Sequence, residues 1–153
     1  HDIARTSRTY DLKKYFIIHP LESQTRLAQE IMDYWQNGYG GQYNPDRLEA
    51  FSVLDIKSDI KSAVEYITER EGTRPIIITT DARKFPNSIS YKNMRQQIES
   101  SGRPYLILFG TGWGIENSVM AIIIICRCEQ PLQLFWTGFL GKNGGNKIKS
   151  YFC

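Results

Sequence analysis

The chain has 153 residues, of which 41% are hydrophobic and 23% are charged, a composition typical of one globular domain that excludes a disordered protein. Its 19 basic and 16 acidic residues leave a net charge of +3, which permits contact with nucleic acid without requiring it. No apolar run approaches the roughly 20 residues that cross a bilayer and no signal peptide opens the chain, so we expect a cytoplasmic protein without a membrane partner.

Helical and strand patterns alternate from the beginning of the chain. A short helix is expected over Asp2–Tyr10, and a strand over Tyr15–Ile18 that stops at His19 and Pro20. The next pattern predicts a helix that ends at Gly38 and packs a stripe of apolar residues into the core. That stripe consists of Leu27, Ala28, Ile31, Met32 and Trp35.

The segment Gly38–Arg47 breaks the helical pattern with three glycines, a proline and two tyrosines, so we expect a loop. Exposed tyrosines can stack on unpaired bases, which makes Tyr39 and Tyr43 candidate substrate-binding residues if the substrate is RNA. A packed turn without a ligand explains the same residues at least as well.

Two further strands are expected at Phe51–Ile56 and Pro75–Ile78. The helix between them is predicted to begin with Ser58 as its cap and to close at Gly72. A last amphipathic helix, Ser90–Ser100, then leads to the most apolar strand.

That strand is Tyr105–Phe109, which a glycine-rich turn follows, and its composition predicts burial on both faces. Strands that alternate with helices predict an α/β fold with a mostly parallel sheet flanked by helices. In such sheets ligands bind beyond the carboxyl ends of the strands, so the loops after Ile78 and Phe109 should build one site. Its candidate residues are Thr79, Thr80, Gly110, Thr111, Gly112, Trp113 and Gly114. A plain tight turn explains the glycines equally well, because their spacing is not the dinucleotide fingerprint.

The three cysteines, Cys126, Cys128 and Cys153, all lie late in the chain. A lone C-x-C without a matching histidine or second cysteine pair does not make a metal site. We therefore expect no metal.

Four segments together are similar to a known family: DIARTSRTY, GYGGQYNPDR, TTDAR with the following PNSISY, and LFGTGWG. In the same order and at matching spacing, they resemble a bacterial family of S-adenosylmethionine (SAM)-dependent RNA methyltransferases. This family belongs to the SPOUT superfamily of knotted α/β enzymes and is similar to the knot domain of the tRNA guanine methyltransferase. The resemblance covers residues 1 to about 120.

The resemblance implies methyl transfer from SAM to RNA, a tRNA or rRNA base, by a homodimer whose loops hold SAM near a trefoil knot. Thr79, Thr80 and Gly110–Gly114 would line the cofactor pocket, chiefly through backbone groups. Arg5 would be the catalytic arginine, contacting phosphate or helping a base lose its proton, and Arg8 would be a second substrate-binding residue. A solvated helix face explains both arginines equally well.

The likeness stops after Met120, so we expect an incomplete SPOUT-like domain over 1–119 and an unrelated tail over 120–153. Reading the tail's codons one base earlier permits the family-like string G-D-Y-N-H-L-S-V-R, which indicates a frameshift after a deletion that also removed one strand and one cofactor loop. The knot-forming part would then be missing and the activity impaired. The family's first strand is also expected to be missing before His1. The alternatives are a non-catalytic α/β domain that binds RNA or nucleotides and an inactive gene fragment.

Overall fold

The computed structural model describes residues 2–81, 85–109, 124–127 and 150–152. Its helices are α1 (Asp2–Thr9), α2 (Glu22–Gln36), α3 (Tyr39–Tyr43), α4 (Pro45–Phe51), α5 (Ile60–Glu71) and α6 (Tyr91–Ser101). Its strands are β1 (Lys14–Ile18), β2 (Leu54–Lys57), β3 (Ile76–Asp81), β4 (Ser88–Ser90), β5 (Tyr105–Leu108), β6 (Ile124–Arg127) and β7 (Ser150–Phe152).

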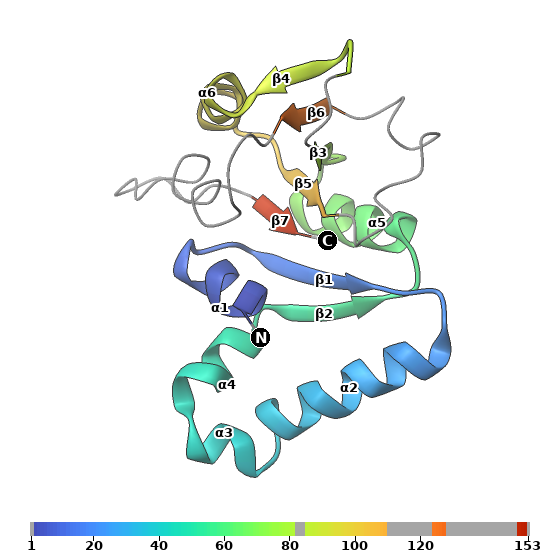
Figure 1. The fold of residues 1–153 in the computed structure, drawn as a ribbon, viewed down its shortest axis with the longest axis vertical. Coiled ribbons are helices and arrows are strands. Elements are labelled where there is room, and N and C mark those ends of the chain that lie inside the picture. Colours follow the sequence, from blue (N-terminus) through green and yellow to red (C-terminus); the bar gives the residue numbers. More distant parts are fainter. Residues whose placement is uncertain (1, 82–84, 110–123, 128–149, 153) are drawn as a thin grey trace.

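The strands form one sheet in the order β2-β1-β7-β5-β3-β6-β4 (Figure 1). All the strand pairs in the described residues are parallel, which confirms the predicted α/β fold. Strand β5 lies between β7 and β3 with all four of its residues buried, as its composition predicts. Strands β6 and β7 come after residue 119 and pair with strands that precede it. The expected knot involves residues outside the described ones.

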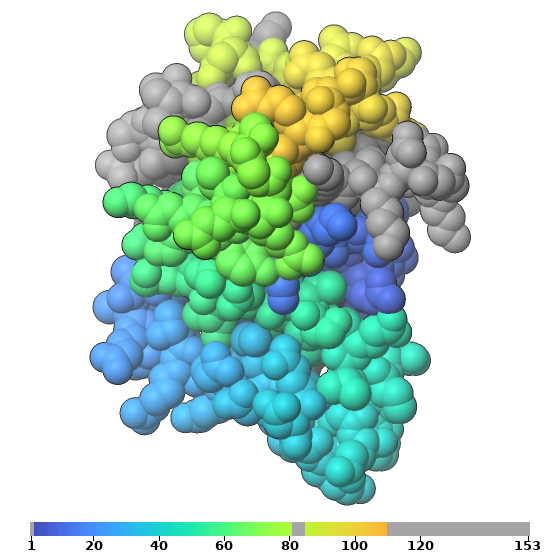
Figure 2. All heavy atoms as spheres, turned by 180° about the vertical axis from the view of Figure 1, so that it is seen from behind, coloured from blue at the N-terminus to red at the C-terminus, as the bar shows by residue number. Residues whose placement is uncertain are grey.

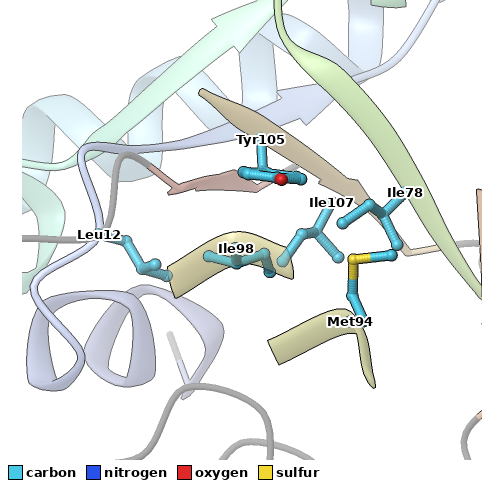
Figure 3. Close-up of a cluster of buried hydrophobic side chains, with 6 residues drawn as sticks. All are labelled: Leu12, Ile78, Met94, Ile98, Tyr105 and Ile107. Atoms are coloured by element: carbon cyan, nitrogen blue, oxygen red, sulfur yellow. The ribbon is translucent and has the colours of Figure 1, made fainter. Parts of the chain in front are cut away.

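Helices cover both faces of the sheet. On one face, Met94 and Ile98 of α6 pack against Ile78 of β3 and Ile107 of β5 (Figure 3). Tyr105 is buried in the same cluster, and its hydroxyl is hydrogen-bonded at 2.7 Å to the Ser101 hydroxyl. On the other face, α5 contributes the residues that cover β1 and β5, namely Ala63, Val64 and Ile67.

The apolar stripe expected on α2 is only half buried. Met32 is buried against Phe51 and Leu54, but 52% of Leu27 and 41% of Ile31 are exposed, so placing these two residues in the core was wrong. The physical reason is the width of the stripe, because a helix on the outside of a sheet buries only the side that faces the strands.

The segment expected to be a loop is helical. Asn44 caps α4 by accepting a hydrogen bond from the Arg47 backbone N–H at 3.1 Å, and Pro45 occupies the first turn. Helix α4 therefore extends through Phe51, which was wrongly assigned to a strand, and β2 begins only at Leu54. The Asn-Pro pair is a helix-start signal that the glycines and tyrosines before it obscured.

Two glycines allow α3 to pack closely on α2. Gly40 and Gly41 are buried, and a Cβ on Gly41 would lie 2.5 Å from the Trp35 carbonyl oxygen. On Gly40 it would lie 2.6 Å from the Tyr34 ring. These glycines thus serve a tight helix contact and not a flexible loop.

Helix α5 is capped by Asp59 and not by Ser58. The Asp59 carboxylate accepts hydrogen bonds from the Ser62 backbone N–H at 2.6 Å and from the Ser62 hydroxyl at 2.9 Å. These bonds, with the Ser62 backbone as the largest cause, lower the pKa of Asp59 below its ordinary value of 3.8. The helix ends as predicted at Gly72, which has a positive φ of 71°.

Candidate functional site

The predicted cofactor edge begins where β3 and β5 end side by side. Thr79 of β3 is in register with Leu108, the last residue of β5, and β6 pairs with Thr79 and Thr80 on the other side. Both threonines therefore belong to a central strand, which corrects their assignment to a loop. The extension of β3 follows from this pairing on two sides, which the sequence after Ile78 does not reveal.

The side chain of Thr79 is the unusual feature of this edge. Thr79 is fully buried at 0% exposure, and among the described residues its hydroxyl has no hydrogen-bond partner. A buried hydroxyl without a partner costs about 1–3 kcal/mol, so natural structures seldom keep one without a reason. A ligand at the end of β3 would supply such a partner. Because the Thr79 backbone already faces strands on both sides, the group left for a ligand is the hydroxyl.

The glycine turn continues from β5, but Gly110, Thr111, Gly112, Trp113 and Gly114 lie outside the described residues. The structure does describe the end of the strand that precedes this turn. Leu108, the last residue of β5, is paired with Thr79. The turn therefore follows the strand next to the one that carries the Thr79 hydroxyl, as expected for neighbouring parallel strands.

The two predicted arginines differ in their partners. Arg5 is largely exposed and lies 3.6 Å from the exposed Asp2, an ion-pair partner within α1. Arg8 donates from Nε to Glu49 at 2.8 Å, donates to it again from Nη2, and lies 3.5 Å from Asp11. Arg8 therefore ties α1 to α4, while Arg5 remains the more accessible cation. Sequence reasoning missed Glu49, because no local pattern links residues 41 positions apart.

Tyr39 and Tyr43 lie one turn apart on α3 and are exposed by 69% and 76%. Their rings are stacked, with centroids 6.5 Å apart and planes at 23°. In α4, the guanidinium of Arg47 lies 4.8 Å from the centroid of the Trp35 ring. The two tyrosines are therefore exposed, on a helix instead of a loop.

The arginine candidates and the threonine candidates lie at opposite ends of the parallel strands. Helix α1 lies at the amino ends of β1 and β2 (Figure 1), and α4 leads directly into the start of β2. Thr79 and Thr80 stand toward the carboxyl end of β3. One chain therefore does not bring Arg5 together with the threonines.

An open groove of about 500 Å³ lies between the end of α2 and α4, lined by Gln36, Pro45, Leu48, Glu49 and Ser52. Its polar side chains already have partners in the protein. Gln36 donates to the Phe51 carbonyl at 2.7 Å, Ser52 donates to the Glu49 carbonyl at 2.7 Å, and the Glu49 carboxylate binds Arg8. We assign this groove no ligand.

In the described ranges, no three histidine, cysteine, aspartate or glutamate side chains gather where they could hold a metal ion. No helix in those ranges is long and apolar enough to span a bilayer.

A parallel α/β sheet with a candidate ligand edge is the architecture of many nucleotide- and cofactor-binding enzymes. The sequence places the chain within this class, because residues 1–129 match the SAM-dependent RNA methyltransferase family. The chain belongs to that family, which confirms the resemblance found in its motifs. The match also continues past residue 120 and includes β6.

Three relatives illustrate the similarity. An uncharacterized protein of Aquifex aeolicus is 37% identical over 120 residues, covering 78% of this chain and 58% of that protein. A tRNA (guanine-N(1)-)-methyltransferase of Nitratidesulfovibrio vulgaris is 37% identical over 120 residues, covering 78% of this chain and 28% of that protein. One of Oleidesulfovibrio alaskensis is 35% identical over 133 residues, covering 87% of this chain and 29% of that protein. The chain thus spans between 28% and 58% of the length of these relatives.

Proposed function

We propose that this chain transfers the methyl group of SAM to RNA, with the cofactor at the carboxyl edge of β3 and β5. The observation that carries the proposal is the buried Thr79 hydroxyl, which lacks a partner in the part of the chain that the structure describes and stands beside the end of β5 in a member of a SAM-dependent family. SAM offers polar adenosine and amino-acid groups that can bond a hydroxyl. Gly110–Gly114 would let the backbone approach the same ligand closely.

The residues present fit this chemistry. The sulfonium of SAM is an activated methyl donor, so the protein has mainly to hold the acceptor atom in line with it and to exclude water. Thr79 and Thr80 would hold the cofactor side, and Arg5 would contact the RNA or help the acceptor base lose a proton. The acceptor belongs to a tRNA or rRNA base, the substrate class that the family resemblance implies.

We further propose that the working unit is a SPOUT-type homodimer. Arg5 and Thr79 lie at opposite edges of the sheet in one chain, so an intramolecular site would lack one of them. A two-fold dimer can bring the α1 of one copy to the cofactor edge of the other. Sedimentation should then give a dimer.

The first experiment is calorimetry with SAM, followed by transfer of radiolabelled methyl groups to bulk RNA. Replacing Gly112 with valine should abolish SAM binding, whereas Arg5→Ala should leave SAM binding intact and remove methyl transfer. No SAM binding by the unmodified chain would refute the proposal. RNA binding without SAM binding would support a non-catalytic domain, and neither activity would support an inactive fragment.

Mixing the two variants tests the dimer. If each site uses Arg5 of one copy and Gly112 of the other, random exchange should restore about a quarter of the wild-type activity, since half of the dimers would carry one intact site. No recovery in a mixture that sedimentation shows to have exchanged would place both residues in one chain's site.

A further inference from the structure

The α3–α4 segment forms a protruding end of the molecule in both views (Figures 1 and 2). At this end the rings of Tyr39 and Tyr43 are stacked and largely exposed to solvent. Two large aromatic side chains that stack on each other without being buried by the fold have an unused face, and aromatic faces are where unpaired bases bind.

Tyr39 and Tyr43 form an aromatic platform, and the backbone that carries it is tightly packed, which limits the loss of entropy on binding. Gly40 and Gly41, between the two tyrosines, are buried against α2 so closely that neither has room for a Cβ. Helix α3 is thereby held at a fixed distance from α2. Because the two rings already stack on each other above this packed backbone, less ordering remains to be done when a ligand binds.

The accessibility of base faces decides which form of RNA the platform can bind. Residues 37–44 contain no charged side chain, so the platform offers its rings and not a charge to a ligand. A duplex keeps its base faces stacked inside, where the exposed rings cannot reach them. An unpaired nucleotide can instead place its base on the ring and turn its backbone away.

Arg47, which follows Tyr43 by four residues in the sequence, offers a cation for that backbone. Arg47 rests on the Trp35 ring and, within the described residues, forms no ion pair with a carboxylate. Its guanidinium can contact one phosphate while the base stacks on the tyrosines. We propose that Tyr39 and Tyr43, with Arg47, form a binding site for unpaired nucleotides of RNA, away from the cofactor edge. The proposal rests on the proposed function for the nature of the substrate.

The test measures RNA binding without SAM, by fluorescence anisotropy with a labelled single-stranded 12-nucleotide RNA and a duplex of the same sequence. The single strand should bind the wild-type protein more tightly than the duplex. Tyr39→Ala combined with Tyr43→Ala should weaken the single-strand complex about 10- to 100-fold, which corresponds to the loss of one or two stacked bases. Tyr39→Phe with Tyr43→Phe keeps the rings and should bind like the wild type.

Two controls separate stacking from other effects. Tyr91→Ala removes another partly exposed tyrosine, on α6, and should change nothing. Arg47→Gln should lower the slope of log affinity against log salt by about one unit, whereas the tyrosine variants should keep the wild-type slope. Wild-type affinity in the double alanine variant, equal binding of duplex, or no binding of single strands would each overturn the proposal. Loss of SAM binding or methyl transfer is measured separately and bears only on the proposed function.

Discussion

Replacing Thr79 with valine separates the two consequences of its unpartnered hydroxyl. Valine has almost the shape of threonine, so the change removes one buried hydroxyl and leaves the packing of β3 between β5 and β6 in place. Without a ligand, the protein should become more stable by about 1 kcal/mol, at the low end of the cost of a buried unpaired hydroxyl. For a chain of this size that is a rise in Tm of about 2–4 °C.

The same substitution should weaken SAM binding. If the hydroxyl bonds the cofactor, the complex loses a hydrogen bond of about 1 kcal/mol, and the free protein no longer contains the unpaired group that binding would satisfy. Together these effects amount to about 2 kcal/mol and raise the Kd of SAM about thirtyfold. Differential scanning fluorimetry measures the Tm, and calorimetry measures the Kd.

Thr79→Ser is the matched control, because it keeps the hydroxyl and removes a buried methyl group. It should lower the Tm and leave the Kd nearly unchanged, the reverse of the valine variant. A valine variant with a raised Tm and an unchanged Kd would show that the hydroxyl is unpaired but does not face the cofactor. A lowered Tm would show that the hydroxyl has a partner in the folded protein.

Three more outcomes are expected. Gly41→Ala would place a Cβ 2.5 Å from the Trp35 carbonyl oxygen and should lower the free energy of unfolding by about 1–3 kcal/mol in chemical denaturation. Gln42→Ala, at the exposed neighbouring position, is the neutral control, and equal stability of the two variants would contradict the tight contact. The pKa of Asp59 is below 3.8 in the folded state, so the stabilising effect of its carboxylate is present at neutral pH and is lost as the pH falls through that lowered pKa. Asp59→Asn caps the helix without titrating and should flatten the acid limb of a plot of Tm against pH. An unchanged acid limb would refute this role of Asp59. A chain rebuilt after Met120 in the shifted frame, with the strand that the hypothetical deletion removed, should methylate bulk RNA faster than the present chain. Equal rates and equal dimerisation would rule out the frameshift hypothesis.

Much of the architecture follows from local patterns. The apolar run 105–108 predicted strand β5, and the glycine at position 72 predicted the end of α5, because each signal depends on residues adjacent in sequence. The helices α3 and α4 were missed, since three glycines normally break helices and here serve a contact with α2 that only the fold reveals. The exposure of Leu27 and Ile31 was missed for a similar reason, as periodicity shows an apolar side but not how much of it is covered.

The candidate site was predictable in part. The adjacency of the ends of β3 and β5 follows from parallel topology, so the threonines could be placed beside the glycine turn. The unpaired state of the Thr79 hydroxyl depends on every neighbour within reach and has no sequence signature. The same is true of the bond from Arg8 to Glu49, which left Arg5 as the freer of the two arginines.

The position of β7 has a consequence for the order in which the molecule folds. Lys14 of β1 is in register with Tyr151 of β7, and β7 separates β1 from β5. The two residues are 137 positions apart (151 − 14), so the middle of the sheet closes only after β7 has been synthesised. Pairings at such separation make folding slow. Until then the facing edges of β1 and β5 are open to other chains, and a nascent or truncated form should therefore depend on chaperones more than its modest size implies.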